Sequence, residues 1–99
     1  MIIAVDFDGC LWDKKINRPL VQVLQSHQRA GDIVILWTCR EGESLRDAVL
    51  KLARAGFAPN YINQNAPQGI KEMGHDSRKI YADVYLDDKA RPFPSRIDY

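Results

Sequence analysis

Short apolar runs alternate with longer amphipathic segments along this chain of 99 residues. Residues 2–7 and 33–37 are rich in isoleucine, valine and leucine and contain few polar side chains, which is typical of strands buried on both faces of a sheet. Between them, apolar residues recur at helical spacing from Pro19, which suits the first turn of a helix, to Gly31, which ends it. We therefore predict a strand, a helix and a second strand.

The alternation continues in the second half of the chain. An amphipathic segment from about Glu43 to Gly56 predicts a second helix, since a glycine commonly follows the last turn. The short apolar runs at 61–62 and 84–86 predict two further strands, and residues 63–74 are interpreted as a loop. Strands that alternate with helices predict an α/β fold, a three-layer Rossmann-like sandwich with a central parallel sheet.

The length of the chain predicts a single domain, residues 1–99, with one modest core. A polar stretch at about 10–18 follows the first strand and is expected to form a small flap. The proline-containing stretch at about 89–99 is expected to be an irregular tail. No segment is long enough for a cap domain, so we expect a site at the edge of the sheet to be open.

Charge and cysteine content argue against several classes of protein. The chain has 14 basic and 13 acidic residues, and a net charge of +1 creates no overall field for a nucleic acid or an anionic membrane. Cys10 and Cys39 are far apart and form no C-x-x-C pair, which argues against a zinc site or a disulfide scaffold. The chain starts directly in the first strand, without a signal-like apolar segment. We expect a cytoplasmic protein without a membrane segment.

Polar side chains follow three of the predicted strands. Asp6 and Asp8 stand at the end of the first strand, Thr38 follows the second, and Asp87 and Asp88 follow the fourth. In open parallel sheets, ligands bind beyond the carboxyl ends of the strands, near the point where the strand order reverses. If these three strands are neighbours, the five residues meet in one small volume, and a functional site is favoured over a simple polar turn.

Several carboxylates at one edge repel each other unless protons or a cation neutralise them. Oxygen ligands without histidine or cysteine favour Mg²⁺, which often binds through one or two carboxylates and a substrate phosphate. A carboxylate beside such a phosphate can attack phosphorus, and a second acid two residues along can protonate the leaving oxygen. The residues therefore indicate phosphoryl chemistry with Mg²⁺ as the cofactor.

In order and spacing, these residues resemble the motifs of the haloacid dehalogenase-like (HAD) phosphohydrolases. The likeness covers nearly the whole chain and is carried by Asp6-Phe7-Asp8-Gly9, Thr38, a lysine, and Leu86-Asp87-Asp88. The resemblance implies that Asp6 is the nucleophile and a metal ligand, and that Asp87 is the second metal carboxylate. It also implies that Asp8 is the general acid/base and lends its main-chain carbonyl to the metal. The first strand is then expected between the second and the fourth.

The lysine of the third motif has two candidates. Lys79 is favoured because Ser77 suits the cap of a short helix that would return the chain to the fourth strand. Lys71 is the rival. Asp88 is expected either to hold this lysine or a metal-bound water, or only to cap the fourth strand.

Other residues near the motifs have weaker assignments. Thr38 is expected to donate a hydrogen bond to a phosphoryl oxygen. Cys39 and Arg40 are further phosphate-binding candidates, although Arg40 also suits a charged loop before a helix. Trp37 continues an apolar strand and is predicted to be core, whereas Trp12 in the flap can either pack or contact a substrate.

Two positions depart from the family pattern. Cys10 stands where threonine is common, and Leu86 stands where a glycine often precedes the acids of the fourth motif. Neither change removes a catalytic atom. Cys10 and Cys39 are interpreted as small packed residues in preference to a redox pair near the site.

The sequence thus predicts an HAD-type phosphatase, a Mg²⁺-dependent phosphomonoesterase that works through an aspartyl-phosphate at Asp6. Its substrate is a phosphorylated compound of unknown identity: a phosphoprotein, a nucleic-acid end, or a small ester enclosed by a homo-oligomer. Charge argues mildly against a polynucleotide. Two alternatives stay open, a metal- or phosphate-binding module with negligible turnover and a phosphotransferase.

Overall fold

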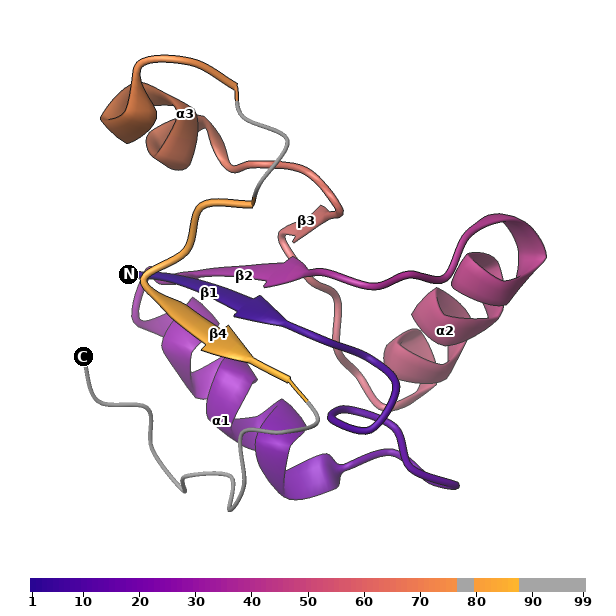
Figure 1. Ribbon diagram of the computed structural model, residues 1–99. Coiled ribbons are helices and arrows are strands. Elements are labelled where there is room, and N and C mark those ends of the chain that lie inside the picture. Colours follow the sequence, from indigo (N-terminus) through magenta and orange to yellow (C-terminus); the bar gives the residue numbers. More distant parts are fainter. Residues whose placement is uncertain (77–79, 88–99) are drawn as a thin grey trace.

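The computed structural model describes residues 1–76 and 80–87 and shows an α/β fold with a four-stranded sheet (Figure 1). The strands are β1 (Ile2–Val5), β2 (Ile33–Leu36), β3 (Tyr61–Ile62) and β4 (Val84–Leu86). They are all parallel and lie in the order β3-β2-β1-β4. The predicted α/β class is confirmed, and β1 lies between β2 and β4 as expected. Both β1 and β2 end slightly earlier than predicted.

Three helices lie in the described part of the chain: α1 (Arg18–Arg29), α2 (Gly42–Arg54) and α3 (Pro67–Met73). The start of α1 is set by two local signals. The side chain of Asn17 accepts a hydrogen bond from the main-chain N–H of Leu20 at 3.3 Å, and Pro19 occupies the first turn, where an N–H has no partner inside the helix. The prediction of this helix is confirmed to within a residue or two.

The prediction of a loop over residues 63–74 is wrong, because it contains α3. Pro67 occupies the first turn, and Gly74, with φ of 79°, follows the last residue in the left-handed conformation that glycine adopts easily. Seven residues are too few to show a clear apolar period, which is why the pattern misleads. A return helix was expected before β4, but residues 80–83 are not helical, and Ser77 lies outside the described residues.

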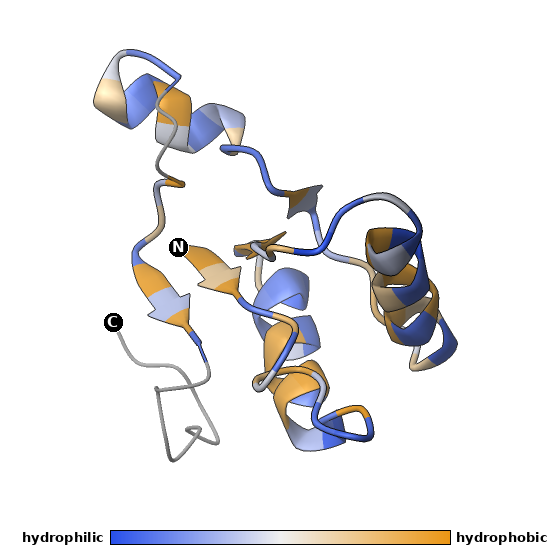
Figure 2. Cartoon of the chain, turned by 45° about the vertical axis from the view of Figure 1, so that its right-hand side comes forward, coloured by the Kyte–Doolittle hydropathy of each residue, from blue (hydrophilic) through white to orange (hydrophobic). Residues whose placement is uncertain are grey.

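The two faces of the sheet are covered differently. On one face, residues of β1 and β2 pack with α1 and α2 in the main core, which includes Ile3, Val5, Val34, Leu36, Leu20, Leu24, Ala48 and Leu52. Figure 2 shows the hydrophobic strands and the hydrophobic stripes on these two helices. The other face carries a smaller buried cluster, made of Ile2, Ala4, Ile35, Ala66 and Ile80. The main core therefore fixes β1 and β2 from one side.

Trp37 lies on the thinly covered face, and its predicted place in the core is wrong, since it is 45% exposed. Alternation along an extended chain places it on the same face as Ile35, two residues earlier. Its ring meets that of Tyr85 edge-on, with 5.8 Å between the ring centroids. An apolar run does not reveal which face of a strand a helix will cover.

The direction of the connections changes at β1. The chain moves from β1 through β2 to β3 and then crosses back to β4 on the other side of β1. Such a reversal leaves a crevice beyond the carboxyl ends of the two strands where it occurs, here β1 and β4. None of the helices within residues 1–76 and 80–87 is long and apolar enough to cross a membrane.

Candidate active site

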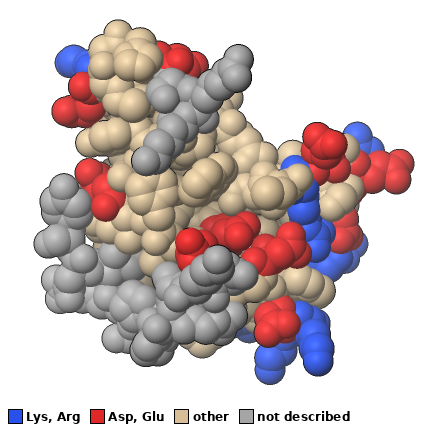
Figure 3. Space-filling view, viewed as in Figure 1, with Lys and Arg blue, Asp and Glu red and all other residues tan. Residues whose placement is uncertain are grey.

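Asp6 and Asp87 lie next to each other at this crevice, each one residue beyond its strand. The main-chain N–H of Asp6 donates to the carbonyl of Leu86 at 2.9 Å, so the ladder between β1 and β4 fixes the main chain at both acids. Asp6 is half-buried, and its Oδ1 accepts a hydrogen bond from the N–H of Phe7 at 2.7 Å. Figure 3 shows acidic side chains gathered over the carboxyl ends of β1 and β4.

Thr38 lies on the other side of β1, two residues beyond the end of β2. The N–H of Trp37 donates to the carbonyl of Val5 at 2.9 Å, which continues the ladder to this point. The N–H of Thr38 donates to the side chain of Asn63 at 2.8 Å, and its hydroxyl oxygen accepts from the N–H of Arg40 at 3.1 Å. The hydroxyl oxygen of Thr38 is thus fixed by the N–H of Arg40, and the hydroxyl proton can be donated to a ligand.

Asp8 is exposed and is held by Arg40 from the loop before α2. The guanidinium donates through Nε to Oδ2 at 2.9 Å and through Nη2 to Oδ1 at 2.8 Å. It also donates to the carbonyl of Ser44 at 3.2 Å and lies over the ring of Phe7, 4.7 Å from the centroid. Two parallel hydrogen bonds of this kind fix the carboxylate more firmly than a single contact would.

This ion pair changes the acidity of both partners. The hydrogen bonds from Arg40 hold the pKa of the Asp8 carboxyl below its ordinary value of 3.8, although partial burial acts in the opposite direction. The same hydrogen bonds raise the pKa of Arg40. Asp8 is therefore ionised at neutral pH in this arrangement, and it gains a proton more readily once it moves away from Arg40.

The flap predicted at about 10–18 corresponds to residues 9–17, because α1 already begins at Arg18, and it folds back on the end of β1. The N–H of Gly9 donates to the carbonyl of Trp12 at 2.8 Å, and the ring of Trp12 stacks on that of Phe7 with 6.1 Å between centroids. The ammonium of Lys51 on α2 lies 5.0 Å from the centroid of the Trp12 ring and pairs with Asp47. Trp12, whose role the sequence left open, packs against both the strand end and α2.

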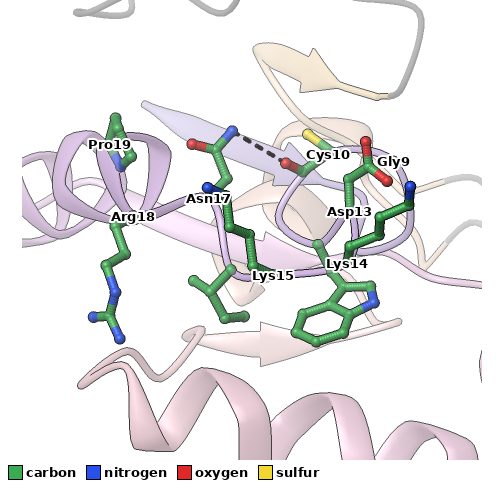
Figure 4. A pocket seen from close by; sticks show the side chains of 10 residues that line it. Gly9, Cys10, Asp13, Lys14, Lys15, Asn17, Arg18 and Pro19 are labelled. Atoms are coloured by element: carbon green, nitrogen blue, oxygen red, sulfur yellow. Dashed lines mark hydrogen bonds between the residues drawn. The ribbon is translucent and has the colours of Figure 1, made fainter.

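A cavity of about 810 Å³ adjoins the flap and does not include the acidic pair. Its lining consists of Gly9, Cys10, Trp12, Asp13, Lys14, Lys15, Ile16, Asn17, Arg18 and Pro19. Figure 4 shows these side chains around the hydrogen bond from Asn17 Nδ2 to the carbonyl of Cys10, at 3.3 Å. The cavity and the acidic pair are therefore separate features. The chain passes from the acids to the cavity lining at Asp8-Gly9.

The remaining predicted residues lie elsewhere. Lys71 is on α3, which Figure 1 shows away from the carboxyl ends of β1 and β4, so the structure does not bring this lysine to the acids. Lys79 and Asp88 lie outside the described residues. Cys10 is buried, as expected, but the interpretation of Cys39 as a packed residue is wrong, since it is exposed beside Thr38; the two form no disulfide.

The donor atoms at the crevice suit Mg²⁺. Among residues 1–76 and 80–87, no three side chains of histidine, cysteine, aspartate or glutamate gather into a metal site. The predicted ligand set, however, needs only the carboxylates of Asp6 and Asp87 and the main-chain carbonyl of Asp8, because Mg²⁺ keeps several waters and shares substrate phosphate oxygens. The neighbouring ends of β1 and β4 provide both carboxylates. The residues present therefore fit the ion.

Sequence reasoning misses two contacts that support the site. Asn63 holds the main chain of Thr38, and its φ of 52° is a conformation that asparagine tolerates. Asparagine is common in turns, so its presence after a strand is a weak signal. Arg40 and Asp8 are 32 residues apart, and no local pattern links them.

Comparison with known proteins relates the chain to a solved structure. No known family matches it in a scan of family models, and no curated protein matches it. Among solved structures, a conserved protein from Bacteroides thetaiotaomicron is similar, with a TM-score of 0.75 and 32% sequence identity. The match covers 92% of this chain and 78% of that protein. The chain therefore belongs to the same family as this conserved Bacteroides protein.

Proposed function

We propose that this protein is a Mg²⁺-dependent phosphomonoesterase of the haloacid dehalogenase-like type, with Asp6 as its nucleophile. The observation that carries the proposal is the pairing of Asp6 with Asp87 at the ends of β1 and β4, where the strand order reverses. Two adjacent carboxylates repel each other unless a cation relieves them, and Thr38 adds a hydroxyl donor from the neighbouring β2. This combination suits a phosphate group held at the crevice.

The reaction has two steps. In the first, a carboxylate oxygen of Asp6 attacks phosphorus, the bond from phosphorus to the leaving oxygen breaks, and protonated Asp8 gives its proton to that oxygen. In the second, Asp8 takes a proton from water, and the water oxygen attacks the same phosphorus. The bond to Asp6 then breaks and inorganic phosphate leaves. Ester and water are converted to alcohol and phosphate, with both acids restored.

The other residues position the phosphate. Asp6, Asp87 and the carbonyl of Asp8 would hold Mg²⁺, which when bound neutralises phosphate charge. Thr38 donates its hydroxyl proton to a phosphoryl oxygen, with Cys39 beside it as a further candidate and Lys79 as the candidate lysine of the third motif. These residues bind and orient the ester, while Asp6 and Asp8 form and break bonds.

The finer architecture belongs to the same proposal, a three-layer sandwich without a cap domain. It is supported by α1 and α2 on one face and by the smaller cluster at Ala66 and Ile80 on the other. The connection between β1 and α1, residues 6–17, contains no element beyond the short flap of residues 9–17, and Asp8 and Asp87 are both exposed. An open site of this kind would serve a phosphorylated substrate in the cytoplasm, with a second copy of the chain as a lid for a small ester.

A second candidate function is a metal- or phosphate-binding module with negligible turnover. It is favoured by one observation, the two hydrogen bonds that hold Asp8 ionised against Arg40. An acid fixed in this way gives no proton to a leaving group. A phosphotransferase would differ from the hydrolase only in the acceptor of the second step, an alcohol in place of water.

The proposal is tested with the Asp6→Asn variant and 4-nitrophenyl phosphate in the presence of Mg²⁺. We expect turnover to fall by at least roughly a thousandfold, because an amide is a poor nucleophile toward phosphorus. The matched control is Glu43→Gln, which removes one carboxylate from the exposed first turn of α2. Circular dichroism melting curves of both variants should stay close to that of the unmodified protein.

Each alternative predicts a different result. Unchanged turnover in Asp6→Asn would exclude Asp6 as nucleophile. A binding module would be stabilised by Mg²⁺ in the melting experiment but would release no phosphate from a broad panel of esters. A phosphotransferase would form a new phosphate ester when an alcohol or a sugar is added.

A further inference from the structure

The cavity beside the flap carries an excess of positive charge that the proposed reaction does not use. Lys14, Lys15 and Arg18 line it, together with one acid, Asp13. None of the ion pairs found among residues 1–76 and 80–87 involves these three cations. By contrast, Arg40 is paired with Asp8 on the α2 side of the same loop. We call this lining the basic recess.

The start of α1 adds to the positive potential of the basic recess. The first turn of α1 contains no acid and begins with Arg18, although acids are favoured there because the amino end of a helix is partially positive. A cation at this place is slightly unfavourable for the helix itself. An anion in the recess would relieve both the helix end and the three cationic side chains.

The conformation of Lys14 supports the same interpretation. Its φ of 65° lies in the left-handed region, where asparagine or glycine would be less strained than lysine. Figure 4 shows Lys14 and Lys15 on the turn that borders the cavity. Figure 3 shows basic side chains over the flap, on the same face of the molecule as the acidic cluster. The turn therefore brings both lysines to the lining of the cavity.

The recess adjoins the reacting acids. It begins at Gly9, the residue after Asp8, and the bridge between Asp8 and Trp12 holds the near end of the flap against the strand end. In the proposed reaction Asp8 protonates the leaving oxygen, so the alcohol part of the ester leaves past this residue. A group attached to that alcohol is therefore the part of the substrate that can reach the flap.

We propose that the basic recess binds a second anionic group, phosphate or carboxylate, on the leaving alcohol, so that the preferred substrates are small phosphomonoesters with two anionic ends. This substrate class rests on the proposed function, whereas anion binding in the recess does not. A cavity of about 810 Å³ is large enough for such a group with part of its carbon chain. Charge-assisted hydrogen bonds from lysine and arginine provide the attraction.

A small molecule fits the charges better than a polynucleotide. A nucleic-acid strand needs basic groups along its path, and the cations that flank the recess on the α2 side, Arg40 and Lys51, are already paired with acids. The net charge of the whole chain is +1. One compact basic recess therefore matches one compact anion.

Binding is tested by calorimetry with hexane-1,6-bisphosphonate and hexylphosphonate in the presence of Mg²⁺. The unmodified protein should bind the bisphosphonate roughly tenfold to a hundredfold more tightly than the monophosphonate. The double variant Lys14→Asn, Lys15→Gln should lose most of this preference. It uses asparagine at position 14 because asparagine tolerates the left-handed turn.

The control variant is Arg29→Gln, Arg46→Gln, which removes the same amount of charge from exposed sites on α1 and α2 that do not line the cavity. It should keep the preference for the bisphosphonate. Equal binding of the two phosphonates by the unmodified protein, or an equal loss in the control, would overturn the assignment of the recess.

Turnover is compared for hexane-1,6-diol bisphosphate, hexyl phosphate and a 5′-phosphorylated oligonucleotide. The ratio of kcat/KM for the first two esters should exceed about ten and should fall in the lysine variant. A preference for the oligonucleotide would overturn the small-substrate class. If no ester is hydrolysed while the bisphosphonate preference depends on Lys14 and Lys15, the recess is an anion site and the proposed phosphatase function fails.

Discussion

The two acids that follow β1 are held in different ways. Asp6 belongs to the sheet edge, where main-chain hydrogen bonds to β4 and β2 continue on both sides of the strand end. Asp8, two residues later, belongs to the flap side, where the position of its carboxylate depends on the side chain of Arg40. A nucleophile has to be stationary, whereas a general acid/base has to change both its proton and its partners. Asp6 is thus held more rigidly than Asp8, as their proposed roles of nucleophile and general acid/base require.

The comparison extends to the neighbouring residues. At the sheet edge, Thr38 is buried and is held through its main chain by Asn63. On the flap side, Trp12 is held by ring contacts and by the ammonium of Lys51. Main-chain ladders are cooperative and rigid, while exposed side-chain contacts open at little cost. Apart from Asp8, which is proposed to transfer the proton, substitutions at the sheet edge should therefore affect activity more than substitutions on the flap side.

After Asp6→Asn, the largest effect is expected from Asp87→Asn at the sheet edge. The variant keeps the shape of the side chain but removes one of the two carboxylates proposed to hold Mg²⁺, so turnover at low Mg²⁺ should fall roughly a hundredfold. Raising the Mg²⁺ concentration should recover part of the loss. The measurement is the initial rate as a function of Mg²⁺, and an unchanged Mg²⁺ dependence would remove Asp87 from the ligand set.

A smaller effect is expected from Thr38→Val compared with Thr38→Ser. Valine removes the hydroxyl that is proposed to donate to a phosphoryl oxygen, whereas serine keeps it, so kcat/KM should fall about tenfold in the first variant only. Valine also removes the acceptor for the N–H of Arg40. Melting temperatures of both variants separate this structural loss from the kinetic one, and equal kcat/KM in the two would contradict the role of the hydroxyl.

On the flap side, Arg40→Gln should change stability in a pH-dependent way. Because Arg40 lowers the pKa of Asp8 in the folded protein, the pair stabilises the fold above the ordinary pKa of 3.8 and loses this effect as the pH falls through the lowered pKa. Asp8 is 55% exposed at its side chain, so solvent screening limits the difference in unfolding free energy at pH 6 to about 1 kcal/mol or less.

The pH dependence is measured by urea unfolding of the unmodified protein, Arg40→Gln and Asp8→Asn. Both variants should lose the same pH-dependent part, which vanishes once the pH is below the lowered pKa of Asp8 in the folded protein. A constant difference between Arg40→Gln and the unmodified protein at every pH would show that Arg40 acts through Phe7 and Ser44 and not through Asp8.

The smallest effect is expected from Lys51→Gln. The variant removes the contact with the ring of Trp12 and the ion pair with Asp47, and solvent screens both contacts, so the loss of stability should be small. Tryptophan fluorescence should report a more mobile flap, while turnover should change less than threefold, a small effect on the activation barrier. A loss of turnover as large as that in Thr38→Val would mean that the flap is as important as the sheet edge.

The sheet edge is also the part of the site that the sequence predicts well. Asp6, Thr38 and Asp87 follow apolar runs, and the physics of parallel sheets brings the ends of such runs to one edge. The chain itself does not reveal the order of the strands, which the resemblance to a known family provided.

The flap side was less predictable for physical reasons. The contact between Asp8 and Arg40 joins side chains 32 residues apart, and only the folded chain brings them together. The prediction that Trp37 is buried was wrong because an apolar run does not show how well each face of a strand is covered. The prediction of a loop at residues 67–73 was wrong because the formation of a short helix depends on the residues at its two ends, Pro67 and Gly74, more than on apolar spacing.

The central claim is that Asp6 carries the phosphoryl group between the two steps. Its most direct test is the intact mass of the protein after rapid acid quenching during turnover of 4-nitrophenyl phosphate with Mg²⁺, followed by peptide mapping. The account predicts a fraction of the chains heavier by one phosphoryl group, located on the peptide that contains Asp6 and absent from Asp6→Asn. Turnover without any covalent phosphate on the protein, or with the phosphate on another residue, would contradict it.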